Sequence, residues 1–292
     1  MSAATADPYG VFGHPVGHSL SPFIHGMFAR ETGQYMSYRL FDVAPAELTE
    51  RVQQFFAEGG RGLNITLPHK VAAVELAHEL TGRAAHAAAV NTLALTDKGV
   101  LGDNTDGAGL VRDIELNAGL PLHGKRVLVL GAGGAAAGAL DPLLATRPAA
   151  LVVANRTPSK GQALVERFAA SAARLDVPLS VATLEAPGAG FDVLINATAA
   201  SLQASVPPLP AGTLKAGALA LDMMYGAAAL PFLRWARSQG AVARDGLGML
   251  VEQAAEAYFV WMGVRPGTFQ VLTELRREVD AQVAAATAGA GT

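Results

Sequence analysis

The sequence predicts an α/β protein of two domains, with a mixed β-sheet in the first domain and a doubly wound parallel sheet in the second. Segments with strand-like and helix-like patterns alternate along the chain, as they do in α/β folds. The apolar runs at Arg126–Leu130 and Phe191–Asn196 are typical of strands buried on both faces, which a parallel sheet requires. The 292 residues are long for one hydrophobic core and sufficient for two.

The first domain is predicted to span residues 1–106. Its first helix is expected over Pro22–Arg30, with Ser21 as the N-cap and Gly33 closing the helix. A hairpin is expected where two apolar segments flank Asp97-Lys98-Gly99. The other elements predicted here are strands at Tyr9–Gly13, Tyr35–Val43 and Gly62–Leu67, helices at Glu47–Ala57 and Val71–Leu80, and the hairpin strands Val90–Thr96 and Val100–Asp103.

The second domain is predicted to span residues 107–242, with boundaries good to a few residues. It is expected to open with a helix at Leu110–Asn117 and to contain the strands Arg126–Leu130, Ala150–Ala154, Phe191–Asn196 and Leu219–Met223. Residues 243–292 are predicted to return to the first domain. Leu247–Trp261 has apolar residues at helical spacing, and a lone helix could not bury such a stripe. The tail from Ala284 is low in complexity and is expected to be mobile.

Composition excludes several classes of protein. The chain has no cysteine, which excludes disulfides, thiolate zinc sites and a catalytic thiol. Its net charge of −3 argues against a nucleic-acid partner. Val127–Leu140 is interrupted by glycines and is shorter than the ~20 apolar residues of a membrane span, and Met1–Pro8 does not look like a secretory signal. We therefore expect a cytoplasmic monomer or homodimer that acts on a small molecule, with no membrane partner.

A glycine motif predicts a dinucleotide site in the second domain. The expected strand Arg126–Leu130 leads into Gly131-Ala132-Gly133-Gly134-Ala135-Ala136, a G-x-G-x-x-A pattern that opens a helix. In a Rossmann-like fold the first glycine permits the tight turn, and the second lets the backbone approach a pyrophosphate at the helix N-terminus. In a chain rich in glycine and alanine this pattern can also be a flexible turn, but the flanking strand and helix favour a dinucleotide.

The next strand indicates which dinucleotide is bound. An NAD site needs an acidic residue about 20 positions after the glycines. Here the strand ends in Asn155-Arg156-Thr157, with Lys160 following and no acidic residue. Arg156 can pair with a 2′-phosphate, and the other three side chains can add hydrogen bonds or charge. The segment therefore predicts NADP(H), although Thr157 could simply cap the next helix.

From the residues alone, the reacting groups stay open. The chain lacks Tyr-x-x-x-Lys and His-Glu-x-x-His, and His14 and His18 lie in an expected loop, so no metal site is predicted. Two polar segments remain, at residues 64–70 and 102–107. Taken singly, Lys70 is typical of a solvated lysine, Ser21 of an N-cap, and Asp106 of a helix cap.

An ordered set of motifs resembles the shikimate dehydrogenase family over roughly residues 9–265. The motifs are Tyr9–Pro22, Asn64-x-Thr66-x-Pro68-x-Lys70, Ala89-Val90-Asn91-Thr92, Gly102-Asp103-Asn104-Thr105-Asp106-Gly107, Gly131–Ala135, Asn155-Arg156-Thr157, Asn196-Ala197-Thr198, Asp222-Met223-x-Tyr225 and Asp245–Leu250. The resemblance implies NADPH-dependent reduction of 3-dehydroshikimate to shikimate, in the synthesis of chorismate and the aromatic amino acids.

The same resemblance implies roles for individual residues. Lys70 and Asp106 would form the catalytic pair, and whether Lys70 moves the proton or mainly binds and polarises stays open. Ser19, Ser21 and Tyr225 would hold the substrate carboxylate, while the ring hydroxyls would bind Thr66, Asn91, Asp106 and Gln253. Thr198, Met223 and Gly246 would contact the cofactor beside the glycine motif. The chain departs from the family at Ala199–Leu202, which blurs the expected contacts near the nicotinamide, and at Lys160, where many members have arginine.

Two other functions remain as alternatives. One is a quinate/shikimate dehydrogenase that uses NAD; relatives of that type tend to carry an acid near Arg156 and a bulkier hydroxyl residue at Ser21. The other is a non-catalytic module of the same fold that senses NADP. The presence of both Lys70 and Asp106 argues against the second alternative.

Overall fold

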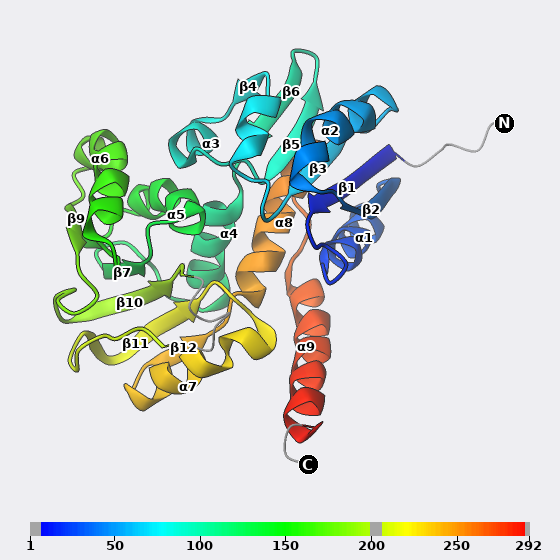
Figure 1. Ribbon diagram of the computed structural model, residues 1–292. Helices are drawn as coiled ribbons and strands as arrows, with labels where there is room; N and C mark the ends of the chain where they lie inside the picture. The colour runs from blue at the N-terminus through cyan, green and yellow to red at the C-terminus, as the bar shows by residue number, and fades with distance from the viewer. Residues whose placement is uncertain (1–6, 199–205, 290–292) are drawn as a thin grey trace. The chain divides into compact units, whose positions relative to one another are not determined.

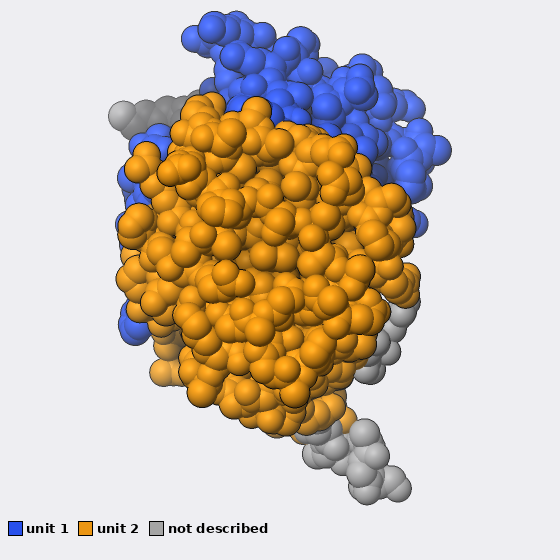
Figure 2. All heavy atoms as spheres, turned by 90° about the vertical axis from the view of Figure 1, so that its left-hand side faces the viewer, with its two compact units in different colours: residues 1–109, 251–271 blue, residues 110–250, 272–292 orange. Residues whose placement is uncertain are grey.

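The computed structural model describes residues 7–198 and 206–289, and its contacts divide the chain into two compact units. Unit 1 comprises residues 1–109 and 251–271, and unit 2 comprises residues 110–250 and 272–292 (Figure 2). The divisions fall inside three helices, α4 (Asp106–Arg112), α8 (Leu247–Met262) and α9 (Phe269–Gly289). Both units are therefore built from separate stretches of the chain.

Unit 1 contains the predicted mixed sheet, with strand order β2-β1-β3-β5-β6-β4 (Figure 1). β1 is parallel to both β2 and β3, whereas β5 is antiparallel to β3 and β6. The strands are β1 (Asp7–Gly13), β2 (Met36–Asp42), β3 (Gly62–Ile65), β4 (Glu79–Leu80), β5 (Thr92–Thr96) and β6 (Gly99–Asp103). The hairpin predicted across residues 97–99 is confirmed as β5–β6.

The helices of unit 1 correct two predictions. Helix α1 (Ser21–Thr32) begins at Ser21 itself, whose amide donates to Ser19 Oγ at 3.3 Å, and Leu20 is the N-cap, so the prediction of Ser21 as N-cap is wrong. Gly33 closes this helix at φ +68°, as predicted. The remaining helical segments before α4 are η1 (Pro45–Glu47), α2 (Leu48–Ala57), η2 (Ala72–Leu76) and α3 (Gly82–Ala87).

The predicted helix at Val71–Leu80 is wrong beyond Leu76. The backbone pairs with β6 instead, because the His78 amide donates to Val100 O at 2.7 Å and the Thr81 amide donates to Gly102 O at 2.9 Å. The His78 ring also accepts a hydrogen bond from the Val100 amide. Pairing at a sheet edge therefore overrides the helical pattern of the apolar residues.

The part of α8 from Val251 onward groups with unit 1. Trp261 donates its Nε1–H to Leu93 O at 3.0 Å. Its ring lies directly on β3, where a Cβ at Gly62 would overlap the indole nitrogen. The Trp261 ring also contacts Tyr9, His25 and Tyr38. A glycine on β3 thus makes the space in which the returning helix docks.

Unit 2 contains a sheet whose described strand pairs are all parallel, in the order β12-β11-β10-β7-β8-β9. The chain winds outward from β7 in one direction and from β10 in the other, which is the doubly wound Rossmann order. Its strands are β7 (Arg126–Leu130), β8 (Ala150–Ala154), β9 (Leu179–Ala182), β10 (Phe191–Asn196), β11 (Leu214–Asp222) and β12 (Val242–Arg244). The helical segments within this unit are η3 (Asp113–Asn117), α5 (Gly134–Ala145), α6 (Pro158–Leu175), η5 (Gly226–Ala229) and α7 (Leu230–Ser238).

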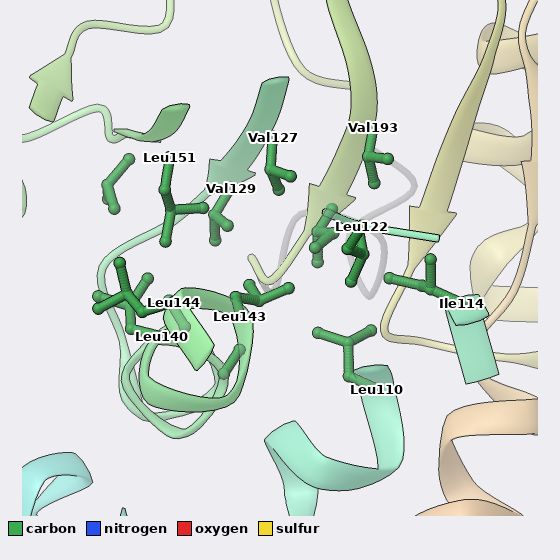
Figure 3. Packing of buried hydrophobic residues seen from close by; sticks show 14 of the residues in the cluster. Leu110, Ile114, Leu122, Val127, Val129, Leu140, Leu143, Leu144, Leu151 and Val193 are labelled. Carbon is green, nitrogen blue, oxygen red and sulfur yellow. The ribbon is translucent and has the colours of Figure 1, made fainter. Parts of the chain in front are cut away.

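Alternate residues of β7 face opposite layers of unit 2. Val127 and Val129 belong to the core that includes Leu140 and Leu143 of α5 (Figure 3). Leu128 and Leu130 belong to the core beneath α7. The strand is therefore buried on both faces, as its continuous apolar run predicts.

Helix α9 continues past Ala284, where a mobile tail was expected to begin, and ends at Gly289. The last three residues lie outside the described ranges. Its residues from Leu272 group with unit 2, whereas Val251–Val271 group with unit 1. The assignment of the substrate domain to 1–106, the cofactor domain to 107–242 and the returning segment to 243–292 stays a prediction. No helix within residues 7–198 and 206–289 is long and apolar enough to cross a membrane.

Candidate active site

Lys70 and Asp106 form an ion pair in unit 1, with 2.6 Å between Lys70 Nζ and Asp106 Oδ2. The Lys70 side chain is 26% exposed and that of Asp106 is 11% exposed. Lys70 follows β3, and its carbonyl accepts a hydrogen bond from the Val90 amide at 2.7 Å. The pair predicted from the resemblance is thus brought together by segments 36 residues apart.

Asn91 connects this pair to a second predicted substrate residue. Its Nδ2 lies 2.8 Å from Asp106 Oδ1, 2.9 Å from Thr105 Oγ1 and 3.3 Å from Gln253 Oε1. Its Oδ1 accepts the Thr105 amide at 2.8 Å. Lys70, Asn91, Asp106 and Gln253 therefore meet at one place, although Gln253 comes from the distant helix α8.

The polar segment after β6 is buried, which the sequence alone did not indicate. Asn104 and Thr105 are 1% and 0% exposed. The Asp106 amide donates to Asn104 Oδ1 at 3.2 Å, and the Asn104 amide donates to Asp103 Oδ1 at 2.7 Å. Asp106 is the first residue of α4 rather than the residue before it, and its carboxylate oxygens bind Lys70 and Asn91, so the helix-cap interpretation is wrong. The backbone conformation that presents the Asp106 carboxylate is held by side chains of its own loop.

Ser19 and Ser21 form a second polar group in unit 1. Ser19 Oγ donates to Ser21 Oγ at 3.1 Å, just before and at the start of α1. Two hydroxyls next to the first turn of a helix suit a carboxylate. Thr66 follows β3 and is half-buried; its amide donates to Phe12 O and its carbonyl accepts from the His69 amide.

The glycine motif of unit 2 lies at the switch point between β7 and β10. Gly131 has φ +104°, and a Cβ there would be 3.1 Å from Ala197 O, so glycine is required by the fold. At Gly133 and Gly134 a Cβ would meet no atom within 4 Å. The first turn of α5 leaves the amides of Gly134, Ala135 and Ala136 without intrahelical acceptors. The open space over these amides fits a pyrophosphate that approaches the backbone closely.

The residues predicted to select NADP lie at the end of β8 and the start of α6. Asn155 Nδ2 donates to Thr157 O at 2.8 Å, which holds the turn. Arg156, Thr157 and Lys160 are exposed. Arg156 and Lys160 form no ion pair or side-chain hydrogen bond with any described residue, and Thr157 makes no side-chain cap bond. A cation with no counter-charge among the described residues suits a ligand phosphate.

Three further predicted cofactor residues surround the ends of β10 and β11. Thr198 Oγ1 donates to Asn196 Oδ1 at 2.7 Å, and the Met223 amide donates to Asn196 O at 3.0 Å. A Cβ at Gly246 would overlap Met223 O, so only glycine permits this close approach. These residues lie at the same end of the sheet as Gly131. The departure from the family at Ala199–Leu202 falls outside the described residues.

Tyr225 lies in unit 2, between β11 and η5, and burial raises the pKa of its hydroxyl. Its expected role with Ser19 and Ser21 stays a prediction. Sequence reasoning also missed Arg83, whose guanidinium binds Asp103 of the buried loop. Within the described ranges, no group of three or more histidine or acidic residues could hold a metal ion.

The fold and these sites define the class of the protein: an α/β oxidoreductase with a dinucleotide-binding sheet and a lysine–aspartate pair. Residues 11–93 match the shikimate dehydrogenase substrate binding domain, residues 115–205 match the shikimate / quinate 5-dehydrogenase family, and residues 246–271 match the shikimate 5′-dehydrogenase C-terminal domain.

Whole-chain comparisons agree. The chain is 53% identical to a shikimate dehydrogenase (NADP(+)) of Acidovorax sp. (strain JS42), over 95% of this chain and 99% of that protein. The crystal structure of an enzyme from Pseudomonas putida is 46% identical, with a TM-score of 0.86 over 92% of this chain and 98% of the other. Shikimate 5-dehydrogenase from Thermus thermophilus in complex with shikimate is 33% identical, with a TM-score of 0.80 over 94% and 99%. The chain belongs to the shikimate dehydrogenase family.

Proposed function

We propose that this protein reduces 3-dehydroshikimate to shikimate with NADPH, and catalyses the reverse reaction with NADP. The observation that carries the proposal is the contact of 2.6 Å between Lys70 and Asp106, within a cluster that includes Asn91 and Gln253. Relatives that cover almost the whole chain are named shikimate dehydrogenase (NADP(+)). In this lysine–aspartate dyad, the Lys70 ammonium is the proton donor and the Asp106 carboxylate holds it in place.

NADPH held by residues 131–135 and 155–160 would supply the hydride that adds to the carbonyl carbon of the substrate. Lys70 stabilises the developing negative charge on the carbonyl oxygen, and a proton is delivered to that oxygen from the ammonium. Asp106 keeps the ammonium in place through Oδ2, while Asn91 holds the other carboxylate oxygen. In the reverse direction the same lysine takes the hydroxyl proton.

Substrate recognition is assigned to the side chains that the family resemblance names. Ser19, Ser21 and Tyr225 bind the carboxylate, while Thr66, Asn91, Asp106 and Gln253 bind the ring hydroxyls. A site built from several buried donors and acceptors discriminates strongly, because an analogue that lacks a hydroxyl leaves one of them without a partner. Residues 1–106 form the substrate domain in this proposal.

The cofactor is assigned to residues 107–242. Gly131, Ala132, Gly133, Gly134 and Ala135 accommodate the pyrophosphate, and Asn155, Arg156, Thr157 and Lys160 bind the adenosine 2′-phosphate. Thr198, Met223 and Gly246 line the nicotinamide end. Arg156 is exposed and has no ionic partner within residues 7–198 and 206–289, and no acidic residue stands at 155–157 to accept a 2′-hydroxyl; both observations support NADP over NAD.

The alternative of a quinate/shikimate dehydrogenase using NAD is tested by steady-state rates. We expect kcat/KM to be higher for shikimate than for quinate, and higher with NADP than with NAD. A higher kcat/KM for quinate with NAD would replace the proposal by the alternative.

A lysine exchange tests the dyad. Lys70→Ala should lower kcat by about 10³-fold, because proton transfer and charge stabilisation are both lost. NADP affinity, measured by fluorescence titration, should change less than about twofold. Lys98→Ala, on the exposed turn of the β5–β6 hairpin, is the matched control and should keep wild-type rates. Equal rates for Lys70→Ala and wild type would refute the dyad, and NADP binding without turnover by the wild type would favour the sensing module.

A further inference from the structure

Arg83 is a half-buried arginine that neither the motifs nor the proposed mechanism uses. It lies in the short helix α3, and its side chain is 25% exposed. Its guanidinium makes three charged hydrogen bonds to two different parts of unit 1. Such a group is expensive to bury unless each of its partners is well placed.

One edge of the Arg83 guanidinium binds the loop that carries Asp106. Arg83 Nε lies 2.7 Å from Asp103 Oδ1, and Nη2 lies 2.5 Å from Asp103 Oδ2, so the contact is bidentate. Thr81 Oγ1 donates to the same Oδ1 at 2.5 Å. Burial raises the pKa of Asp103, but the hydrogen bonds and charge of Arg83 outweigh it, and the net pKa lies below its usual range. Asp103 is therefore a carboxylate fixed by its arginine.

Hydrogen bonds within the loop connect the Asp103 carboxylate to the backbone of Asp106. Its Oδ1 accepts the Asn104 amide at 2.7 Å, and Asn104 Oδ1 accepts the Asp106 amide at 3.2 Å. The backbone of Asp106 is thus two hydrogen bonds away from a carboxylate that Arg83 holds.

The remaining terminal nitrogen of the guanidinium, Nη1, binds helix α8. Arg83 Nη1 lies 3.1 Å from Glu256 Oε1, and Glu256 also pairs with Arg265. Glu256 follows Gln253 by three residues, so the two lie on neighbouring turns of one helical face. α4 and α8 also touch near this point, because a Cβ at Gly109 would lie 2.5 Å from the Gln253 amide nitrogen.

We propose that Arg83 is a positioning residue for the reaction, which sets Asp106 against Gln253 by binding Asp103 and Glu256 at the same time. This inference rests on the proposed function. Misplacement of a reacting group by about 1 Å can cost about 100-fold in rate, so a residue that touches no substrate can still control kcat.

The first test measures turnover. Arg83→Gln should lower kcat by about 10- to 100-fold while KM for NADPH stays within about twofold. Arg61→Gln, an exposed arginine of the same unit, is the matched control and should be unchanged. Arg83→Lys keeps the charge but not the fork, and should recover only part of the loss. If Arg83→Gln does not fold, Glu256→Gln serves instead, because it spares the pair with Asp103 and should still lower kcat.

Double-mutant cycles separate positioning from a general loss of structure. Arg83→Gln and Gln253→Ala should be non-additive, with a combined loss in kcat at least about threefold smaller than the product of the single losses. Arg83→Gln and Ser21→Ala should multiply, because Ser21 lies outside the chain of contacts. Multiplicative losses in both cycles would overturn the proposal.

Hydrogen exchange tests the positioning without any turnover. In Arg83→Gln the Asn104 and Asp106 amides should exchange at least about tenfold faster than in wild type, while Arg61→Gln should leave them unchanged. Unchanged exchange of these amides would refute the role of Arg83. Failure of the wild type to oxidise shikimate would instead refute the proposed function, so the two failures are distinguishable.

Discussion

The polar residues Asn91 and Asp106 of unit 1 are buried and hydrogen-bonded to each other. By contrast, three proposed cofactor residues of unit 2, Gly133, Arg156 and Lys160, are exposed. Asn91 and Asp106 are 2% and 8% exposed, and their hydrogen bonds are made within the chain. Arg156 and Lys160 have no ionic partner among the described residues, and Gly133 faces no neighbouring atom. The difference indicates that the catalytic geometry is formed before binding, while the cofactor itself completes the interactions of unit 2.

This contrast predicts different penalties in the two units. Substitutions in the polar interior of unit 1 should affect stability as well as activity. Substitutions at the exposed cofactor residues of unit 2, such as Gly133 and Arg156, should affect affinity alone. Three experiments examine this expectation, in order of decreasing expected effect.

The largest effect is expected at His25, a fully buried residue behind the Ser19–Ser21 segment. Burial lowers its pKa to about 3, against a hydrogen bond to Asn64 that raises it. Below pH 6.5 the His25 side chain takes up a proton in the unfolded chain but not in the folded protein. The free energy of unfolding therefore decreases as the pH is lowered. At pH 4.5 the loss from this residue is about 3 kcal/mol.

Urea unfolding at pH 7 and pH 4.5 measures this loss. His25→Phe keeps an aromatic ring beside Tyr38 and should lose less stability on acidification than wild type by about that amount. His123→Phe, at an exposed histidine, should behave like wild type. If His25→Phe lost as much stability as wild type between pH 7 and pH 4.5, the burial of His25 would not be the cause of the loss.

The second experiment replaces Arg156 of unit 2. Arg156→Gln should lower the preference for NADPH over NADH by about 10- to 100-fold, since a charged hydrogen bond to phosphate contributes about 1.5–3 kcal/mol. The melting temperature should stay the same, because Arg156 makes no ionic contact with the described residues. Measured kcat/KM for both cofactors decides the point, with the exposed Arg174→Gln as control. An unchanged ratio of kcat/KM for NADPH to kcat/KM for NADH would show that the 2′-phosphate does not bind Arg156.

The third experiment compares two glycines of one motif. Gly133→Ala should weaken NADP binding by about tenfold or more with little loss of stability, because its Cβ would occupy open space that the pyrophosphate is expected to use. Gly131→Ala should lower stability by about 1–3 kcal/mol, because φ is +104° and Ala197 O is close. Thermal unfolding and cofactor titration separate the two outcomes. Loss of stability in Gly133→Ala would contradict the assignment of that space to a ligand.

Local pattern predicted much of this molecule. The bounds of β7, β8 and β10 match the predicted strands, because continuous apolar runs in a doubly wound sheet leave little ambiguity. The meeting of Lys70 with Asp106 was expected only through the family resemblance, since each alone looks like an ordinary surface or capping residue.

The parts that escaped prediction depend on contacts between distant segments. Residues 77–81 pair with β6, and no helical period reveals that pairing. Arg83 stands in an alanine-rich helix start, and its partners Asp103 and Glu256 are 20 and 173 positions away. A sequence shows neither the depth at which such an arginine is buried nor the carboxylates that surround it.

The split composition of unit 1 has a consequence for synthesis of the protein. Residues 1–109 emerge from the ribosome well before Val251–Val271, which supply Gln253, Glu256 and Trp261 to the same unit. At 5–20 residues per second, the interval is on the order of ten seconds. Throughout that interval β3 lacks the indole that covers Gly62, and Arg83 lacks one of its two carboxylates. The nascent chain therefore cannot complete unit 1 until residues 251–271 have been made.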